Sequence, residues 1–213
     1  MIRIQLENIG KKYVREWIFR GVNYEFLNNQ YYAILGSNGS GKSTLLQVIS
    51  SFLTPSEGDI KYFDDEQEIA IESFYKHFSI ATPYLELLEE FTLLEALDFH
   101  RKLKPFYHDI SNQQIVKILD LEKARNKKLQ NYSSGMKQRV KLGLALLSKT
   151  DLVLLDEPTA NLDAQAIEWY QNLVEEYKQN RIIIVCSNHI EAEYDFCTHT
   201  IVMEDYKKLQ REK

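Results

Sequence analysis

Apolar and polar residues alternate along the first thirty positions of the chain. Ile2, Ile4 and Leu6 fall on one face of an extended segment, turn residues follow around positions 8–10, and WIFRGVNYEFL at 17–27 resumes a strand-like pattern. A period of two is typical of β-strands that bury one face. The chain is therefore predicted to begin with β structure.

Two later runs are apolar throughout, DLVLLDE at 151–157 and RIIIVCS at 181–187. A shorter run, YYAILG at 31–36, leads into a glycine-rich loop. Strands that are buried on both faces have this composition. These runs predict a parallel sheet that is covered by helices.

Helical signals are frequent between the glycine-rich loop and residue 151. TLLE at 92–95 and SNQQ at 111–114 are capping-box patterns. Apolar residues recur at helical spacing here and after the second apolar run: Ile115, Ile118 and Leu119; Val140, Gly143, Leu144 and Leu147; Ala166, Tyr170, Leu173, Val174 and Tyr177. The pattern predicts an α/β core interrupted by a helical insert at about 82–148.

Composition and charge indicate which classes of protein this chain does not fit. The 213 residues carry a formal net charge of −5, which argues against nonspecific binding to nucleic acid or to an anionic lipid surface. No apolar run approaches the roughly 18 residues that span a bilayer, and the N-terminus lacks a signal-peptide core, so a cytosolic protein is expected. Cys186 is expected in the core and Cys197 as a free thiol, since their spacing fits neither a metal site nor a disulfide framework.

The segment GSNGSGKST at 36–44 matches the pattern G-x-x-x-x-G-K-[ST] between a predicted strand and a predicted helix. Backbone N–H groups of such a loop surround a triphosphate, helped by the positive end of the helix. Lys42 is expected to reach the outer phosphates, Ser43 to bind Mg²⁺ through its hydroxyl, and Thr44 to bind phosphate. The predicted ATP-binding residues of this loop are Gly36, Ser37, Asn38, Gly39, Ser40, Gly41, Lys42, Ser43 and Thr44.

The apolar run LVLLDEP delivers two carboxylates to the carboxyl edge of the sheet, where ligands bind in open α/β folds. Asp156 is expected to hold Mg²⁺ through water, and Glu157 to polarise an attacking water. The alternative is that Asp156 and Glu157 are a surface pair at the end of a strand, with no role in binding or catalysis.

The order of the phosphate loop, YSSGMKQR at 132–139, LVLLDEPTANLD at 152–163 and SNH at 187–189 strongly resembles the nucleotide-binding subunit of ATP-binding cassette (ABC) proteins. The resemblance covers nearly the whole chain. It implies a single ABC-type domain over 1–213, with a P-loop NTPase core, an N-terminal antiparallel β subdomain and an inserted α-helical subdomain.

The resemblance also implies that two cassettes, identical or paralogous, associate head to tail around ATP. YSSGM stands where the family carries its signature motif, so Ser133, Ser134 and Gly135 would contact the γ-phosphate of the partner's ATP. Asp163 matches the loop that crosses to the partner. Taken alone, Ser133 and Asp163 would be ordinary helix caps.

Two further residues match family positions. His189 matches the histidine that contacts the γ-phosphate and orders the attacking water, which makes it a catalytic candidate beside Glu157 and Lys42. Tyr13 matches the aromatic residue that stacks on adenine, although the chain has many aromatic residues and Trp17 is close.

The family's glutamine after the strand that follows EGDI is missing. Thr82, Pro83 or Tyr84 stands in its place, so either hydrolysis is slower or coupling uses other contacts. The adjacent PYLELLEEF at 83–91 is rich in apolar residues. It is either a docking surface for a membrane subunit or the core of the helical insert.

We therefore expect an ATPase with ATP and Mg²⁺ as ligands, peripheral on the inner face of the cell membrane. It would power transport through a permease on a separate chain without inserting into the bilayer. The alternatives are a soluble ABC ATPase of the assembly or repair type, and a P-loop kinase or GTPase, which the signature stretch disfavours.

Overall fold

The computed structural model describes residues 1–208, and the predicted domain's last five residues lie outside them. The alternating residues at the start form an antiparallel sheet in the order β2-β1-β4-β5. Its strands are β1 (Ile2–Tyr13), β2 (Glu16–Leu27), β4 (Glu57–Asp64) and β5 (Gln67–Glu68). Ile2, Ile4 and Leu6 are buried on one face, which confirms the predicted β structure.

The apolar runs form a second sheet in the order β6-β7-β8-β3-β9, and every paired strand in it is parallel. Its strands are β3 (Tyr31–Leu35), β6 (Phe78–Ala81), β7 (Leu152–Asp156), β8 (Ile182–Ser187) and β9 (His199–Val202). Strands β7 and β8 are buried along their whole length, as predicted from their composition. Because the strands run in parallel, their carboxyl ends meet at one edge of the sheet.

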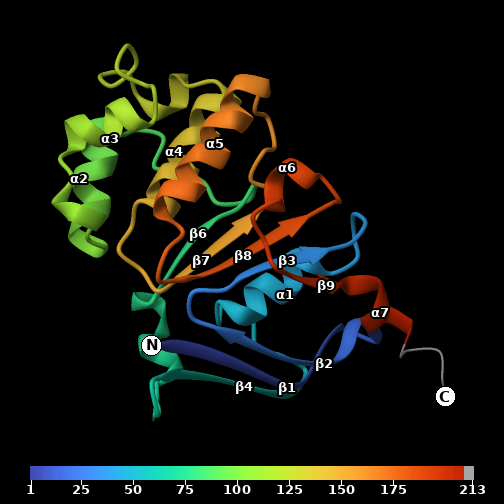
Figure 1. Ribbon diagram of the computed structural model, residues 1–213. Helices are drawn as coiled ribbons and strands as arrows, with labels where there is room; N and C mark the ends of the chain where they lie inside the picture. Colours follow the sequence, from blue (N-terminus) through green and yellow to red (C-terminus); the bar gives the residue numbers. More distant parts are fainter. Residues whose placement is uncertain (209–213) are drawn as a thin grey trace.

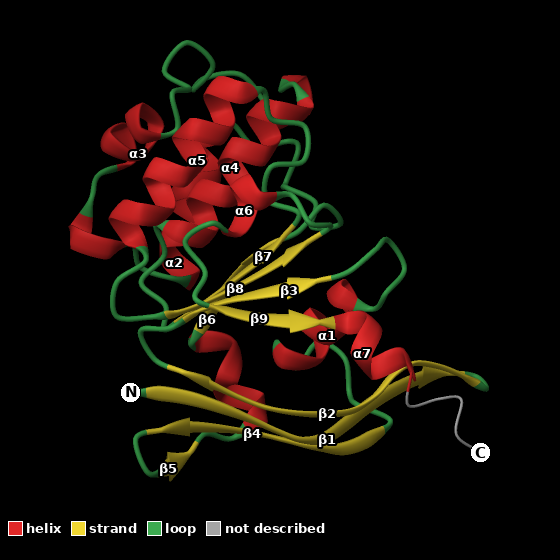
Figure 2. Cartoon of the chain, turned by 45° about the vertical axis from the view of Figure 1, so that its right-hand side comes forward, coloured by secondary structure: helices red, strands yellow, loops and turns green. Residues whose placement is uncertain are grey.

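The chain packs in layers, with α1 (Lys42–Ile49) between the two sheets and the larger helices on the far face of the parallel sheet (Figures 1 and 2). Those helices are α2 (Leu93–Leu103), α3 (Asn112–Ile118), α4 (Ser134–Leu146) and α5 (Ala164–Tyr177). Short helical segments are η1 (Ile71–Lys76), η2 (Tyr107–Asp109), η3 (Leu129–Asn131), α6 (Glu191–Tyr194) and α7 (Met203–Lys208). One apolar cluster fills the space beside α1, and another lies under the larger helices.

Both predicted capping boxes are present in the helical insert. The Thr92 side chain accepts a hydrogen bond from the backbone N–H of Glu95, and the Glu95 carboxylate accepts one from the backbone N–H of Thr92. Ser111 and Gln114 form the same pair of bonds at α3. Residues 83–91, by contrast, contain no helix. The insert is therefore less regular at its start than the sequence pattern indicated.

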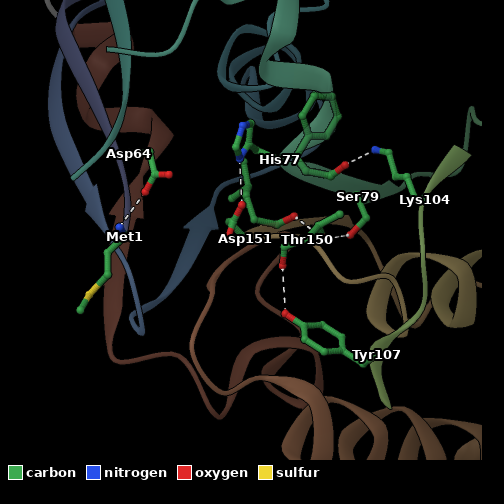
Figure 3. Close-up of polar contacts among 10 residues, drawn as sticks. Met1, Asp64, His77, Ser79, Lys104, Tyr107, Thr150 and Asp151 are labelled. Carbon is green, nitrogen blue, oxygen red and sulfur yellow. Dashed lines mark hydrogen bonds and ion pairs between the residues drawn. The ribbon is translucent and has the colours of Figure 1, made fainter. Parts of the chain in front are cut away.

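Polar contacts connect the insert to the amino edge of the parallel sheet (Figure 3). Lys104, just after α2, donates to the backbone carbonyl of Phe78, and burial lowers its pKa to about 8. Ser79 donates to the carbonyl of Ala145 over 2.7 Å and lies 2.8 Å from the Thr150 hydroxyl. These bonds fix α2 and α4 against β6.

Cys186 is fully buried in β8, which confirms the prediction of a core residue, and burial raises its pKa well above the ordinary value. Cys197 is partly buried, and both thiols are free. Within residues 1–208, no helix has the length and apolar character needed to cross a bilayer.

Candidate active site

The phosphate loop connects β3 to α1 at the carboxyl edge of the parallel sheet. Gly41 is the N-cap of α1 with φ of 105°, in the left-handed region that favours glycine. A Cβ on Gly41 would lie 2.8 Å from the Ile18 side chain of β2. The glycine therefore allows both the turn and the close approach of the antiparallel sheet.

Lys42, the cation of the loop, is buried, with 4% of its surface exposed. Its Nζ donates to the backbone carbonyls of Gly36 over 2.7 Å and Ser37 over 3.1 Å. These carbonyls keep the ammonium group inside the curve of the loop. Phosphate oxygens could replace them as stronger, charged acceptors.

Helix α7 also contacts the loop, a feature that no sequence motif indicated. Glu204 Oε1 accepts hydrogen bonds from the Ser37 N–H over 2.8 Å and from the Ser37 hydroxyl over 3.0 Å, and the N–H bond lowers the pKa of Glu204. Lys207 donates to the Gly39 carbonyl over 2.8 Å. The loop is thus held on two sides by residues that follow β9.

Asp156 ends β7 and is only 2% exposed. Burial raises its pKa, while the hydroxyl of Ser43 and the charge of Lys42 oppose that shift. Within the described residues, the buried Oδ1 has no hydrogen-bond partner. A hydrated Mg²⁺ held by the Ser43 hydroxyl and nucleotide phosphates would supply that missing donor through water, so the residues fit this ion.

Glu157 and His189 both have left-handed backbones, with φ of 47° and 59°. The Glu157 N–H donates to the Cys186 carbonyl of β8 over 2.9 Å, which extends the pairing of β7 and β8 to the residue directly after Asp156. His189 follows the end of β8 and is exposed. The catalytic roles of both residues stay predictions.

A cleft of about 380 Å³ opens over the phosphate loop. The residues that line it are Asn38, Gly39, Gly41, Lys42, Ser43, Thr44, Tyr84 and Glu157. The phosphate loop and the candidate base, Glu157, thus line one cavity. The structure also places Tyr84 there, whereas the sequence left open which of residues 82–84 would lie near the nucleotide.

The predicted signature residues lie at the start of α4, away from this cleft lining. Ser133 is the N-cap, and its Oγ accepts from the Met136 N–H over 3.2 Å. A Cβ on Gly135 would lie 3.0 Å from the carbonyl of Asn161. The signature turn therefore packs against the loop that leads to Asp163, which caps α5 by accepting from the Ala166 N–H over 2.8 Å.

A buried glutamate that sequence reasoning missed supports the same loop. Glu193 of α6 is fully buried and accepts from the Thr159 N–H over 3.1 Å and from its hydroxyl over 2.7 Å. It fixes the backbone two residues after Glu157. No local pattern around Glu193 marks this contact, because its partner lies 34 residues away in the sequence.

Tyr13 is the last residue of β1 and is 48% exposed. The Lys11 ammonium lies 5.4 Å from its ring centroid. The ring is outside the cleft lining in the isolated chain. Its role in adenine stacking stays a prediction.

Comparison with known proteins agrees with this geometry. The sequence pattern of the ABC transporter family matches residues 19–160. An uncharacterized ABC transporter ATP-binding protein of Bacillus subtilis, YybJ, is 30% identical over 94% of this chain and 92% of its own. The linearmycin resistance ATP-binding protein LnrL of the same organism is 26% identical over 95% of this chain and 66% of its own.

Solved structures share the fold. The dimeric structure of a bacterial ABC transporter cassette has a TM-score of 0.76 and 24% identity, and covers 93% of each chain. A post-hydrolysis cassette dimer bound to ADP and phosphate has a TM-score of 0.78 and 23% identity, again over 93% of each chain. The fold is thus that of an ABC ATPase cassette. On its sequence match and its fold, the chain belongs to the ABC transporter family as an ATP-binding cassette.

Proposed function

We propose that this chain hydrolyses ATP to power transport through a separate membrane permease. The observation that carries the proposal is the shared cleft, in which the phosphate loop faces Glu157 while Asp156 presents a buried, unpaired oxygen beside Ser43. The names of the relatives, which describe ATP-binding proteins of ABC transporters and of a resistance system, favour a transporter over a soluble assembly or repair ATPase.

The backbone N–H groups of residues 36–44 and the start of α1 would bind the phosphates of ATP. Lys42 would leave its two loop carbonyls and pair with the outer phosphates. Ser43 and, through water, Asp156 would hold Mg²⁺, which neutralises phosphate charge when bound.

Glu157 would act as the general base. Its carboxylate accepts a proton from a water molecule as the water oxygen bonds to the γ-phosphorus and the bond from phosphorus to the ADP oxygen breaks. His189 would orient this water and contact the γ-phosphate. The products are ADP and inorganic phosphate.

The remaining half of each site would come from a second copy of this chain or from a paralogous cassette. Ser133, Ser134 and Gly135 lie outside the cleft lining of their own chain, yet Ser133 begins a helix of 13 residues. The N-terminus of that helix would contact the partner's γ-phosphate, and Asp163 would cross the interface. Loss of the γ-phosphate would then open the dimer.

The permease would hold the cassette at the inner face of the cell membrane. Leu85 and Leu88 are 42% and 46% exposed, whereas Leu87 and Phe91 pack against the apolar cluster under the helices. The sequence left open whether residues 83–91 form a docking surface or the core of the insert, and exposure differs among their apolar side chains. We assign Leu85 and Leu88 to docking of a cytoplasmic segment of the permease, and Leu87 and Phe91 to the core of the insert.

The test of the shared site mixes two inactive variants of the full chain. Lys42→Ala removes the phosphate-loop cation, and Ser133→Arg blocks the signature turn. A mixed dimer retains one composite site with both halves intact, so ATPase activity should return to about a quarter of the wild-type level by random pairing. If the mixture stays as inactive as each variant alone, or if the wild-type chain hydrolyses ATP at full rate as a monomer, the proposal is wrong.

A further inference from the structure

Helix α6 directly follows the turn that carries His189, and it packs against β8 and α5 (Figure 1). Its residue Glu193 is fully buried. Glutamate is almost never buried completely unless its carboxyl group is paired. The contacts of Glu193 therefore indicate why an acid occupies this position.

Within the described residues, only one oxygen of this carboxyl group is paired. Glu193 Oε1 accepts from the Thr159 N–H over 3.1 Å and from the Thr159 hydroxyl over 2.7 Å, whereas Oε2 is buried without a hydrogen-bond partner. A buried oxygen that lacks a donor destabilises a folded chain. Stability alone is therefore a weak reason for an acid here, and the two bonds to Thr159 are its visible contribution.

Thr159 lies inside the turn that carries the candidate base. The Ala160 N–H donates to the Glu157 carbonyl over 3.0 Å, so Thr159 is the third residue of a four-residue turn that begins at Glu157. The φ of Glu157 is 47°, a left-handed conformation that costs free energy in residues other than glycine and persists only where the surroundings hold it. By fixing Thr159, Glu193 restrains the backbone of Glu157.

Glu193 is itself fixed from two sides. The buried hydroxyl of Tyr170 on α5 donates to the Glu193 carbonyl over 2.8 Å, and the Glu193 N–H donates to the Ile190 carbonyl over 3.0 Å. The Ile190 N–H donates to the Ser187 hydroxyl over 3.1 Å, which closes the turn around His189. A continuous set of hydrogen bonds thus runs from the His189 turn, through Glu193, to the turn of the candidate base.

We propose that Glu193 is a positioning residue for ATP hydrolysis, which aligns the turn of Glu157 with the turn of His189 through its two bonds to Thr159. The inference rests on the proposed function and adds a residue that acts through others. The base and the group that orients the water must be aligned on one γ-phosphate, and a displacement of about 1 Å can lower a rate about 100-fold. None of these bonds involves the phosphate loop, so Glu193 should affect turnover and leave ATP binding unchanged.

The experiment compares Glu193→Met and Glu193→Gln in the full chain, with kcat, KM and ATP affinity as readouts. Glu193→Met has a similar length but no oxygen acceptor, and it should lower kcat about tenfold while KM and ATP affinity stay within about threefold. Glu193→Gln keeps an acceptor for Thr159 and should recover most of that loss. Ser79→Ala is the control for a purely structural change, because Ser79 is buried on β6, outside the cleft lining, and its hydroxyl donates to the Ala145 carbonyl. Its kcat should stay within about twofold of the wild type although its stability falls.

A double-mutant cycle with Thr159→Val identifies the contact. Thr159→Val removes the hydroxyl donor and keeps the N–H, so it should lower kcat less than Glu193→Met does. The double variant should be no slower than Glu193→Met alone, because both changes break the same contact.

Four results would each overturn the positioning role: unchanged kcat in Glu193→Met, no recovery in Glu193→Gln, an equal loss in Ser79→Ala, or losses that add in the double variant. Should Glu193→Met fail to fold, Thr159→Val alone decides, and unchanged kcat in that variant overturns the proposal. Normal turnover in Glu157→Gln would instead refute the proposed function, whatever the result at Glu193.

Discussion

Gln138 donates a buried hydrogen bond of 2.9 Å from Nε2 to the backbone carbonyl of Pro158. The bond joins α4, which begins at the signature residues, to the chain that directly follows Glu157. Within one subunit, the signature helix is therefore fixed to the chain after Glu157, although the two would contribute to different ATP sites of the proposed dimer.

Gln138→Met should lower the free energy of unfolding by about 1–3 kcal/mol, because the Pro158 carbonyl is left buried without a donor. Urea unfolding followed by circular dichroism measures this change. Gln47→Met, at an exposed position of α1, serves as the control and should change stability by less than about 0.5 kcal/mol. Equal stability of the two variants would show that the Gln138 bond contributes nothing.

Glu157→Gln should reduce kcat by about 10²-fold or more, because an amide cannot accept the proton of the attacking water. ATP binding should persist, and a nucleotide-bound dimer should accumulate. Steady-state phosphate release and size-exclusion chromatography with ATP measure both effects. Glu168→Gln, exposed on α5, is the control, and normal turnover in Glu157→Gln would remove the assignment of the base.

Leu88→Glu should release the permease while leaving ATPase activity of the isolated cassette intact, since the side chain is exposed and apolar. Co-purification of the cassette with its permease from membranes measures the binding of the two proteins. Leu87→Glu is the informative comparison. It places a charge against the apolar cluster and should unfold the insert, so loss of permease binding there would not identify a docking residue.

The stability of the protein should depend on pH through His100. Its ring stacks on Phe106 and its Nε2 lies 2.7 Å from the Ser148 hydroxyl. Burial, followed by the charges of Lys104 and Arg101, lowers its pKa from the ordinary 6.5 to about 4. Between these values the unfolded chain binds a proton that the folded chain does not, so stability falls as pH falls from 6.5 to 4.

His100 should account for up to about 3 kcal/mol of this loss, at about 1.4 kcal/mol per pKa unit. Urea unfolding of the wild type and of His100→Gln across this range isolates the effect, because glutamine does not titrate. The wild-type curve should have the steeper decline. Parallel curves would mean that His100 titrates alike in the folded and unfolded chain.

Much of the fold could be predicted because its signals are local. Strands β7 and β8 are apolar along their whole length, the phosphate loop stands between a strand and a helix, and the caps at Thr92 and Ser111 involve residues three apart. Each pattern depends on neighbours in the sequence. Periodicity and motif spacing are therefore sufficient to recognise them.

The contacts that sequence reasoning missed join distant residues. Glu204 and Ser37 are separated by 167 positions, and Lys141 and Thr82 by 59. The irregular course of residues 83–91 depends on such tertiary bonds, so no periodic pattern could indicate it. The same reason explains why Tyr84 could not be singled out before the strand register was known.

The hydrogen bonds between α7 and the phosphate loop affect how nucleotide binding by truncated forms of this protein should be interpreted. A chain that ends before Glu204 loses the acceptor for the Ser37 N–H, and one that ends before Lys207 loses the donor to the Gly39 carbonyl. Weak nucleotide binding by such a fragment would then result from a phosphate loop that has lost its bonds to α7. Helix α7 is therefore a structural support of the proposed ATP site.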